Sequence, residues 1–119
     1  MKRLIAAALL LVTSCTSSDD REHRQIVQQV EQQVQLPSGA KQLKDYARYY
    51  ATDGNRVVAR YITLVDPKND YYDLPLGQVR WVEDHRNLPA ISDGGCSVVE
   101  VRYDPAAGKV EQAVCNGQA

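Results

Sequence analysis

The chain has 119 residues, of which 24% are charged and 44% hydrophobic, and its formal net charge is -1. This length fits one domain and excludes a two-domain enzyme or a large cofactor-binding fold. The sequence has no run of basic residues that would neutralise phosphates, which argues against a nucleic-acid partner. Its apolar content is too high for a disordered tail.

The amino-terminal segment is typical of an export signal. Lys2 and Arg3 precede an unbroken apolar run over residues 4–12. This run is about half of the ~20 residues that a membrane-spanning helix needs. A basic start followed by a short apolar run predicts a signal peptide that is removed after export.

The end of this segment, Val12-Thr13-Ser14-Cys15, resembles the lipobox of bacterial lipoproteins, in which an aliphatic residue and two small residues precede a cysteine. The resemblance implies cleavage after residues 1–14 and attachment of lipid to Cys15. Two or more acyl chains give a stable membrane anchor. The alternative is an ordinary secretory signal with Cys15 near the cut.

The residue after the cysteine bears on location. Thr16 stands where an aspartate would resemble the retention signal of the inner membrane. We therefore expect the mature chain on the periplasmic face of the outer membrane, or free in the periplasm if Cys15 is not acylated. Residues 15–20 are expected to form a tether, and residues 21–119 a single domain.

Two further cysteines, Cys96 and Cys115, make an even pair in an exported chain. Oxidising compartments join such pairs, so the spacing predicts a disulfide. The chain-entropy account assigns about 3 kcal/mol to a loop of this size. The alternative, a nucleophilic Cys96 exposed by Gly94 and Gly95, would need a base and would be silenced by pairing with Cys115.

Residues 20–35 are predicted to form an amphipathic helix. Asp19 and Glu22 are placed as the cap and its partner, and Pro37 and Gly39 follow the end. The apolar residues recur at helical spacing, at Ile26, Val27, Val30 and Val34. Glutamines cover the other faces, which suits either solvent or a partner helix.

Residues 43–52 and 55–65 are predicted to pair as a hairpin around Asp53-Gly54, with Thr52 opposite Asn55. One face of this hairpin is expected to be the core side; it carries Leu43, Ala47, Tyr49, Val58, Ile62 and Leu64. The other face is expected to point outward; it carries Tyr46, Arg48, Tyr50, Val57, Ala59 and Tyr61.

A short strand over 78–83 and a second hairpin, 96–104 with 109–115, follow. Placing Asp104 opposite Lys109 also sets Arg102 opposite Glu111, and it gathers an apolar face of Val99, Val101, Tyr103, Val110 and Val114. The two cysteines are then diagonal and too far apart, so we expect a bulge or strong twist beside them. A register slipped by two residues places the cysteines opposite each other but pairs like charges.

Together these elements predict an α+β fold of two layers, with one amino-terminal helix lying across an antiparallel sheet of about five strands. Cystatin-like folds and small assembly lipoproteins share this order of elements, which is an analogy of outline alone.

Neither histidine belongs to a zinc motif. Asp84-His85, with Ser92 or Ser97, would be the one acid–base arrangement for an enzyme, and nothing near it resembles a nucleophile elbow. The loop oxygens of Asp66, Asn69, Asp70 and Asp73 suit calcium, but Tyr71 stands where the EF-hand pattern needs glycine. We therefore predict no catalytic residue, no metal and no cofactor.

Tyrosine is the compositional anomaly, with seven Tyr, one Trp and no Phe. The candidate binding surface combines the outward hairpin face with the loop that follows it, and comprises Tyr46, Arg48, Tyr50, Tyr61, Tyr71 and Tyr72. Tyrosine and arginine dominate binding hot spots. The alternative is that these tyrosines serve as strand formers, or that the helix covers them.

Three segments, GNRVVARYITLV, VRWVEDHRNLPAISDGGC and VRYDPAAGKVEQAVCNG, resemble a group of small exported bacterial proteins over residues 36–117. This resemblance implies no particular activity, so no functional residue is transferred. We expect a lipid-anchored, non-catalytic binding or assembly module that meets an envelope protein, and the sequence leaves its oligomeric state open. The alternatives are a secreted inhibitor, for example of lysozyme, and a carrier of a small ligand.

Overall fold

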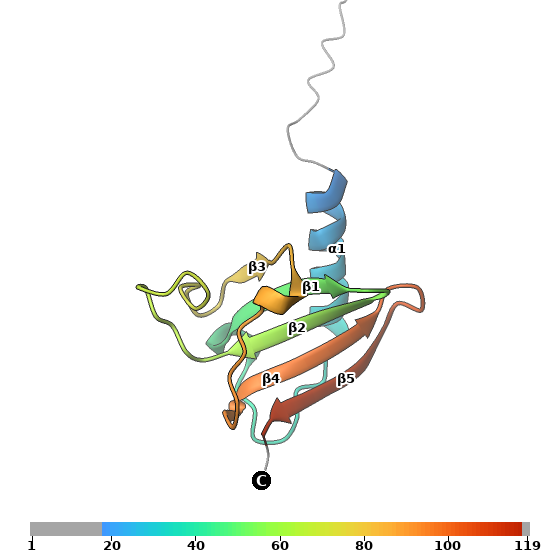
Figure 1. The fold of residues 1–119 in the computed structure, drawn as a ribbon. Helices are drawn as coiled ribbons and strands as arrows, with labels where there is room; N and C mark the ends of the chain where they lie inside the picture. Colours follow the sequence, from blue (N-terminus) through green and yellow to red (C-terminus); the bar gives the residue numbers. More distant parts are fainter. Residues whose placement is uncertain (1–17, 118–119) are drawn as a thin grey trace, which may run out of the picture.

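The computed structural model describes residues 18–117. One helix, α1 (Ser18–Gln33), packs on a five-stranded sheet with the order β3-β1-β2-β4-β5 (Figure 1). The strands are β1 (Ala47–Asp53), β2 (Arg56–Ile62), β3 (Val79–Trp81), β4 (Gly95–Asp104) and β5 (Lys109–Asn116), and two short 3-10 helices are η1 (Leu43–Asp45) and η2 (His85–Asn87). The predicted α+β fold is confirmed. No helix within the described range is long and apolar enough to cross a membrane.

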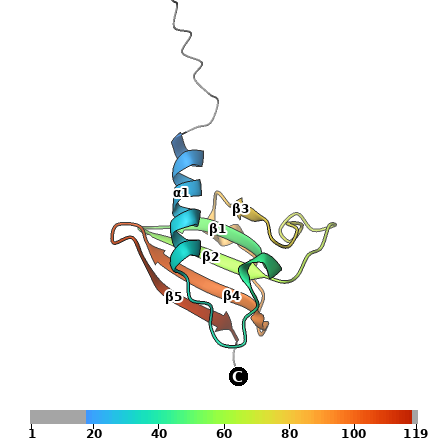
Figure 2. The ribbon, with the colours of Figure 1, turned by 180° about the vertical axis from the view of Figure 1, so that it is seen from behind.

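Helix α1 follows the predicted apolar stripe. Val30 is fully buried, and Ile26, Val27 and Val34 pack around the same core. The helix begins at Ser18, so residues 18–20 of the expected tether are already helical. Its carboxyl-terminal half crosses the sheet, whereas its amino-terminal half projects beyond the β3 edge (Figures 1 and 2).

The sheet is mixed, because β3 runs parallel to β1, with Arg48 beside Val79 and Tyr50 beside Trp81. The expectation of an entirely antiparallel sheet is wrong at this strand. After β2 the chain crosses the sheet face opposite the helix, where Leu74 is buried against β1. It then enters β3 beside the start of β1, where the Gly77 N–H donates to the Tyr46 carbonyl (2.9 Å). That entry point fixes the parallel direction.

The first hairpin forms with a register shifted from the predicted one. Thr52 lies opposite Val57 and Asp53 opposite Arg56, so Gly54 and Asn55 are the turn residues. Gly54 has φ 60°, which suits glycine at the first position of a type II′ turn. The shift of two residues preserves strand alternation, so the strand residues of the two predicted sets still share their faces. Leu43 is the exception, because it lies in η1 and packs against the core that contains Val30 of α1.

The assignment of those faces is wrong, because α1 covers the face that was expected to point outward. The core beneath the helix joins both hairpins, as expected, and contains Val30, Tyr46, Tyr50, Val57, Ala59, Tyr61, Val99, Val101 and Tyr103. The opposite face is also buried over β1, by the loops that precede and follow β3; its core is Ala47, Tyr49, Ala51, Ile62, Leu74, Leu88 and Val98. Because both faces of β1 are covered, alternation alone does not identify the helix side.

The second hairpin has two irregularities. Asp104 pairs with Lys109 as predicted, but a bulge beside Tyr103 places Arg102 opposite Gln112 instead of Glu111. The bulge turns Ala113, not the predicted Val114, toward the helix-side core. The second irregularity lies between Gly95 and Val99, which confirms the bulge expected beside the cysteines.

Candidate binding site

The predicted tyrosine surface is buried. Five tyrosines, which are Tyr46, Tyr49, Tyr50, Tyr61 and Tyr103, are each at most 1% exposed. The expectation of an exposed face is therefore wrong for Tyr46, Tyr50 and Tyr61, since α1 lies over them. Each of the five hydroxyls makes a hydrogen bond. Buried tyrosine hydroxyls need such partners, and these partners explain why tyrosine, not phenylalanine, fills this core.

Glu31 of α1 is the acceptor at the centre of a buried hydrogen-bond network. Its carboxylate accepts hydrogen bonds from Arg48 Nε and from the Tyr50 hydroxyl, both at 2.8 Å. The Tyr50 and Tyr61 hydroxyls lie 2.5 Å apart. Burial raises the pKa of both tyrosines well above its usual range. Arg48 is thus a mostly buried partner of Glu31 and not the exposed binding residue that was expected.

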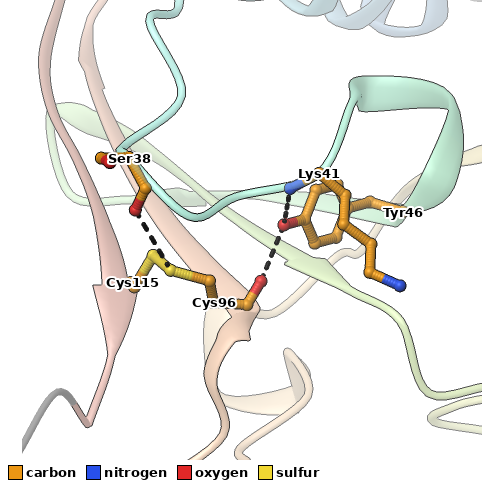
Figure 3. Close-up of a disulfide and its surroundings, with 5 residues drawn as sticks. All are labelled: Ser38, Lys41, Tyr46, Cys96 and Cys115. Carbon is orange, nitrogen blue, oxygen red and sulfur yellow. Dashed lines mark hydrogen bonds between the residues drawn. A yellow bond between two sulfur atoms is a disulfide. The ribbon is translucent and has the colours of Figure 1, made fainter.

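Tyr46, the residue before β1, connects the start of this strand to the disulfide. Its hydroxyl donates to the Cys96 carbonyl (2.7 Å) and accepts the Lys41 N–H (2.9 Å), as Figure 3 shows. The predicted bond between Cys96 and Cys115 is present, with a Cα–Cα distance of 4.5 Å. The segment after α1 is therefore attached to the end of the second hairpin.

The other predicted site residues do not join one surface. Tyr71 is 57% exposed in the loop before β3, whereas Tyr72 packs against the core of the opposite sheet face. Cys15 lies outside the described residues.

A polar cleft of about 230 Å³ lies on the sheet face opposite the helix, and its wall includes His85. His85 Nε2 is 3.6 Å from Asp53 Oδ1. The carboxylate of its neighbour Asp84 lies 3.9 Å from His85 Nδ1. Asp84 also accepts hydrogen bonds from Arg86, which are the main reason that the pKa of its carboxyl is lowered to about 2. Arg60 and Glu100, on the opposite wall, form an ion pair at 3.1 Å. The charged side chains of this cleft thus mostly pair with one another.

In the loop over residues 66–73, which was considered for calcium, side-chain oxygens accept hydrogen bonds from the backbone of the same loop. Asp66 Oδ1 accepts the Lys68 N–H, and Asn69 Oδ1 accepts the Tyr71 N–H. Among residues 18–117, no group of three or more His, Cys, Asp or Glu side chains is arranged to hold a metal ion.

A larger hollow than the polar cleft lies between α1 and β3. We call it the notch; it has a volume of about 490 Å³ and is lined by Asp20, His23, Arg24 and Val27 of α1 and by Gln78, Val79 and Trp81. The His23 ring stacks on Trp81, with 3.8 Å between centroids and 4° between planes. Trp81 in turn lies 6.2 Å from the Tyr50 ring. The notch therefore has an aromatic wall that continues into the core.

The notch was not predicted from the sequence, because it depends on the pairing of β3 with β1. Two signals were present. The single tryptophan lies in a short strand, and His23 extends the helical stripe one turn before Val27.

A third hollow, of about 220 Å³, flanks β3 on its other face. Arg80 lies above the Tyr49 ring at 5.9 Å and pairs with Asp73 at 2.7 Å. Tyr71 and Asp70 line the outer part of this hollow. Strand β3 is therefore bordered by open space on both faces.

These features define a disulfide-bonded α+β domain with a notch at one sheet edge. Comparisons with family models, curated proteins and solved structures find no match to the chain.

Proposed function

We propose that the chain is a lipid-anchored, non-catalytic binding module of the cell envelope, and that the notch is its binding site. The observation that carries this proposal is the notch itself. Its 490 Å³ falls within the ~300–1,000 Å³ typical of ligand sites. Its lining combines an aromatic stack and Val27 with the charged groups of Asp20 and Arg24. Such a lining suits a partner that is apolar at its centre and polar at its rim.

The walls of the notch are held in place before any partner arrives. Glu31 links α1 to Arg48 and Tyr50 of β1, and β1 holds β3 by parallel pairing. A site that is ordered in advance loses less conformational entropy on binding. This rigidity supports a binding role.

The proposed anchor would place the notch near the membrane. Ser18, where α1 begins, is the third residue after Cys15. Three residues span at most about 11 Å. Lipid on Cys15 would therefore hold the start of α1 close to the bilayer, and Asp20, one wall of the notch, follows two residues later.

Photocrosslinking in the native envelope tests the proposal. A photoreactive residue at Val27 should give one defined adduct, while the same residue at Leu64, which is 49% exposed away from the notch, should not. Cys15→Ser should remove both acylation and the adduct. Failure to form an adduct at Val27, or identical adducts at both positions, would contradict the proposal.

A small-ligand carrier is the second candidate, because the size of the notch also suits a small apolar molecule. Native mass spectrometry of the purified protein separates the two functions. A retained small molecule that Val27→Asp abolishes would favour the carrier, whereas an unliganded mass together with the Val27 protein adduct would favour the binding module.

A further inference from the structure

Strand β3 is an edge strand of the sheet, and one side of it has no strand partner among residues 18–117. On its inner side the Arg48 N–H donates to the Gln78 carbonyl (2.9 Å), and the Val82 N–H donates to the Tyr50 carbonyl (2.7 Å). Backbone groups of alternate residues point to opposite sides of a strand. The N–H and C=O groups of Val79 and Trp81 therefore point away from the sheet.

Helix α1 extends above the position that a further strand would take. The stack of His23 on Trp81 shows where the helix passes over the edge strand. Residues 18–22 continue beyond that point (Figures 1 and 2). At 1.5 Å per residue they extend about 7 Å, whereas a neighbouring strand would lie only ~4.8 Å away. The notch is thus the space beneath the helix beside an open sheet edge.

The opposite edge of the sheet is covered differently. Gln33 of α1 accepts the Val110 N–H (3.0 Å) and donates to the Gly108 carbonyl (2.8 Å). These bonds occupy backbone groups at the start of β5. Natural sheets block their edges by such means. The end of the β5 edge that lies beside α1 is therefore blocked, whereas the β3 edge beneath α1 is open.

From this geometry we propose that the β3 edge receives an extended peptide segment of a partner protein, which adds a sixth strand beneath α1. The inference rests on the proposed binding function and specifies its partner. Strand addition uses backbone hydrogen bonds for affinity and side-chain pockets for specificity. Here the bonds come from Val79 and Trp81, and the notch is the pocket on the helix side.

Charge defines the chemistry of this segment. Arg24 is exposed at the notch, and no ion pair among residues 18–117 involves it. A partner strand presents side chains i and i+2 on one face. An apolar side chain against Val27 and Trp81, followed two residues later by glutamate or aspartate facing Arg24, fits both features. The proposed partner is therefore an alternating β segment with one acidic side chain placed at Arg24, because Asp20 also lines the notch and would repel further negative charge.

The test uses the purified mature domain and an acetylated peptide of alternating valine and threonine with one glutamate, with a lysine twin as control. Amide hydrogen exchange is read by NMR, and the fluorescence of Trp81, the single tryptophan, reports affinity. The glutamate peptide should slow exchange at the Val79 and Trp81 amides. Exchange along the β5 edge should stay unchanged.

Variants then test the pairing. Arg24→Glu should weaken the glutamate peptide about fivefold and strengthen the lysine twin, as expected for an exposed ion pair. Val79→Lys should reduce affinity at least about tenfold, because a lysine on an edge strand opposes strand addition. Leu64→Lys, a matched change at an exposed apolar residue away from the edge, should leave affinity unchanged.

Two results would overturn the inference: unchanged exchange at Val79 and Trp81 at saturating peptide, or equal protection of β5. If the Val27 photoadduct still forms in either case, the binding module stands and only the strand-addition mode fails. If the peptide protects Val79 and Trp81 but no envelope adduct forms at Val27, the edge chemistry is supported and the envelope function is contradicted.

Discussion

The hydroxyl of Tyr61 lies 2.5 Å from that of Tyr50 beneath α1, and Tyr50 donates onward to Glu31 of the helix at 2.8 Å. Because the Glu31 carboxylate can only accept, the proton order runs from Tyr61 to Tyr50 to Glu31. These two hydrogen bonds attach the helix to both strands of the first hairpin.

Tyr50, the middle residue of these hydrogen bonds, is predicted to contribute more to the free energy of unfolding than Tyr61. Tyr50→Phe leaves the Tyr61 hydroxyl buried without its acceptor and removes a donor from Glu31, so it should cost about 2–3 kcal/mol. Tyr61→Phe removes only the terminal donor and should cost about 1 kcal/mol. Urea unfolding followed by circular dichroism measures both. Equal costs, or a larger cost for Tyr61→Phe, would contradict the proton order.

Alkaline pH should destabilise the fold. Burial raises the pKa of Tyr50 and Tyr61 above the ordinary value of 10.0. Above that pH the unfolded chain loses protons that the folded chain keeps, so stability is complete below about pH 10 and falls as pH rises. The slope approaches about 1.4 kcal/mol per pH unit for each tyrosine. Urea unfolding midpoints between about pH 9 and pH 11 should fall, and less steeply in Tyr50→Phe. A flat profile would contradict the burial of these hydroxyls.

The disulfide and Tyr46 are predicted to act together. Replacing Cys96 and Cys115 by alanine should cost about 3 kcal/mol. Tyr46→Phe, which removes hydrogen bonds to Cys96 and Lys41, should cost about 1–2 kcal/mol. Residues that share contacts are not additive, so the triple variant should lose less than the sum. Strict additivity would show that the two features are independent.

Much of the fold could be predicted from local signals. The spacing of Ile26, Val27, Val30 and Val34 indicated the helix, and the even cysteine pair indicated the disulfide. Opposite charges at Asp104 and Lys109 correctly aligned the start of the second hairpin. Each of these signals involves residues close in sequence or joined by one short turn.

The missed features depend on contacts distant in sequence. Both faces of β1 are buried, so alternation marks two faces without saying which one the helix covers. The parallel direction of β3 depends on where the preceding loop crosses the sheet, which Leu74 fixes only after folding. The notch follows from that strand and could not be predicted without it. The residue types of the tyrosine surface suggested a binding surface. Burial, not residue type, decides whether an aromatic side chain is available to a partner, and burial could not be predicted from the sequence.

The central claim is a binding module held at the envelope by Cys15, and the non-reduced intact mass of the protein from its native membrane tests its anchor most directly. The account predicts the mass of residues 15–119 plus acyl chains, less the hydrogens lost in the disulfide between Cys96 and Cys115. A mass without acyl chains, found in the soluble fraction, would contradict it.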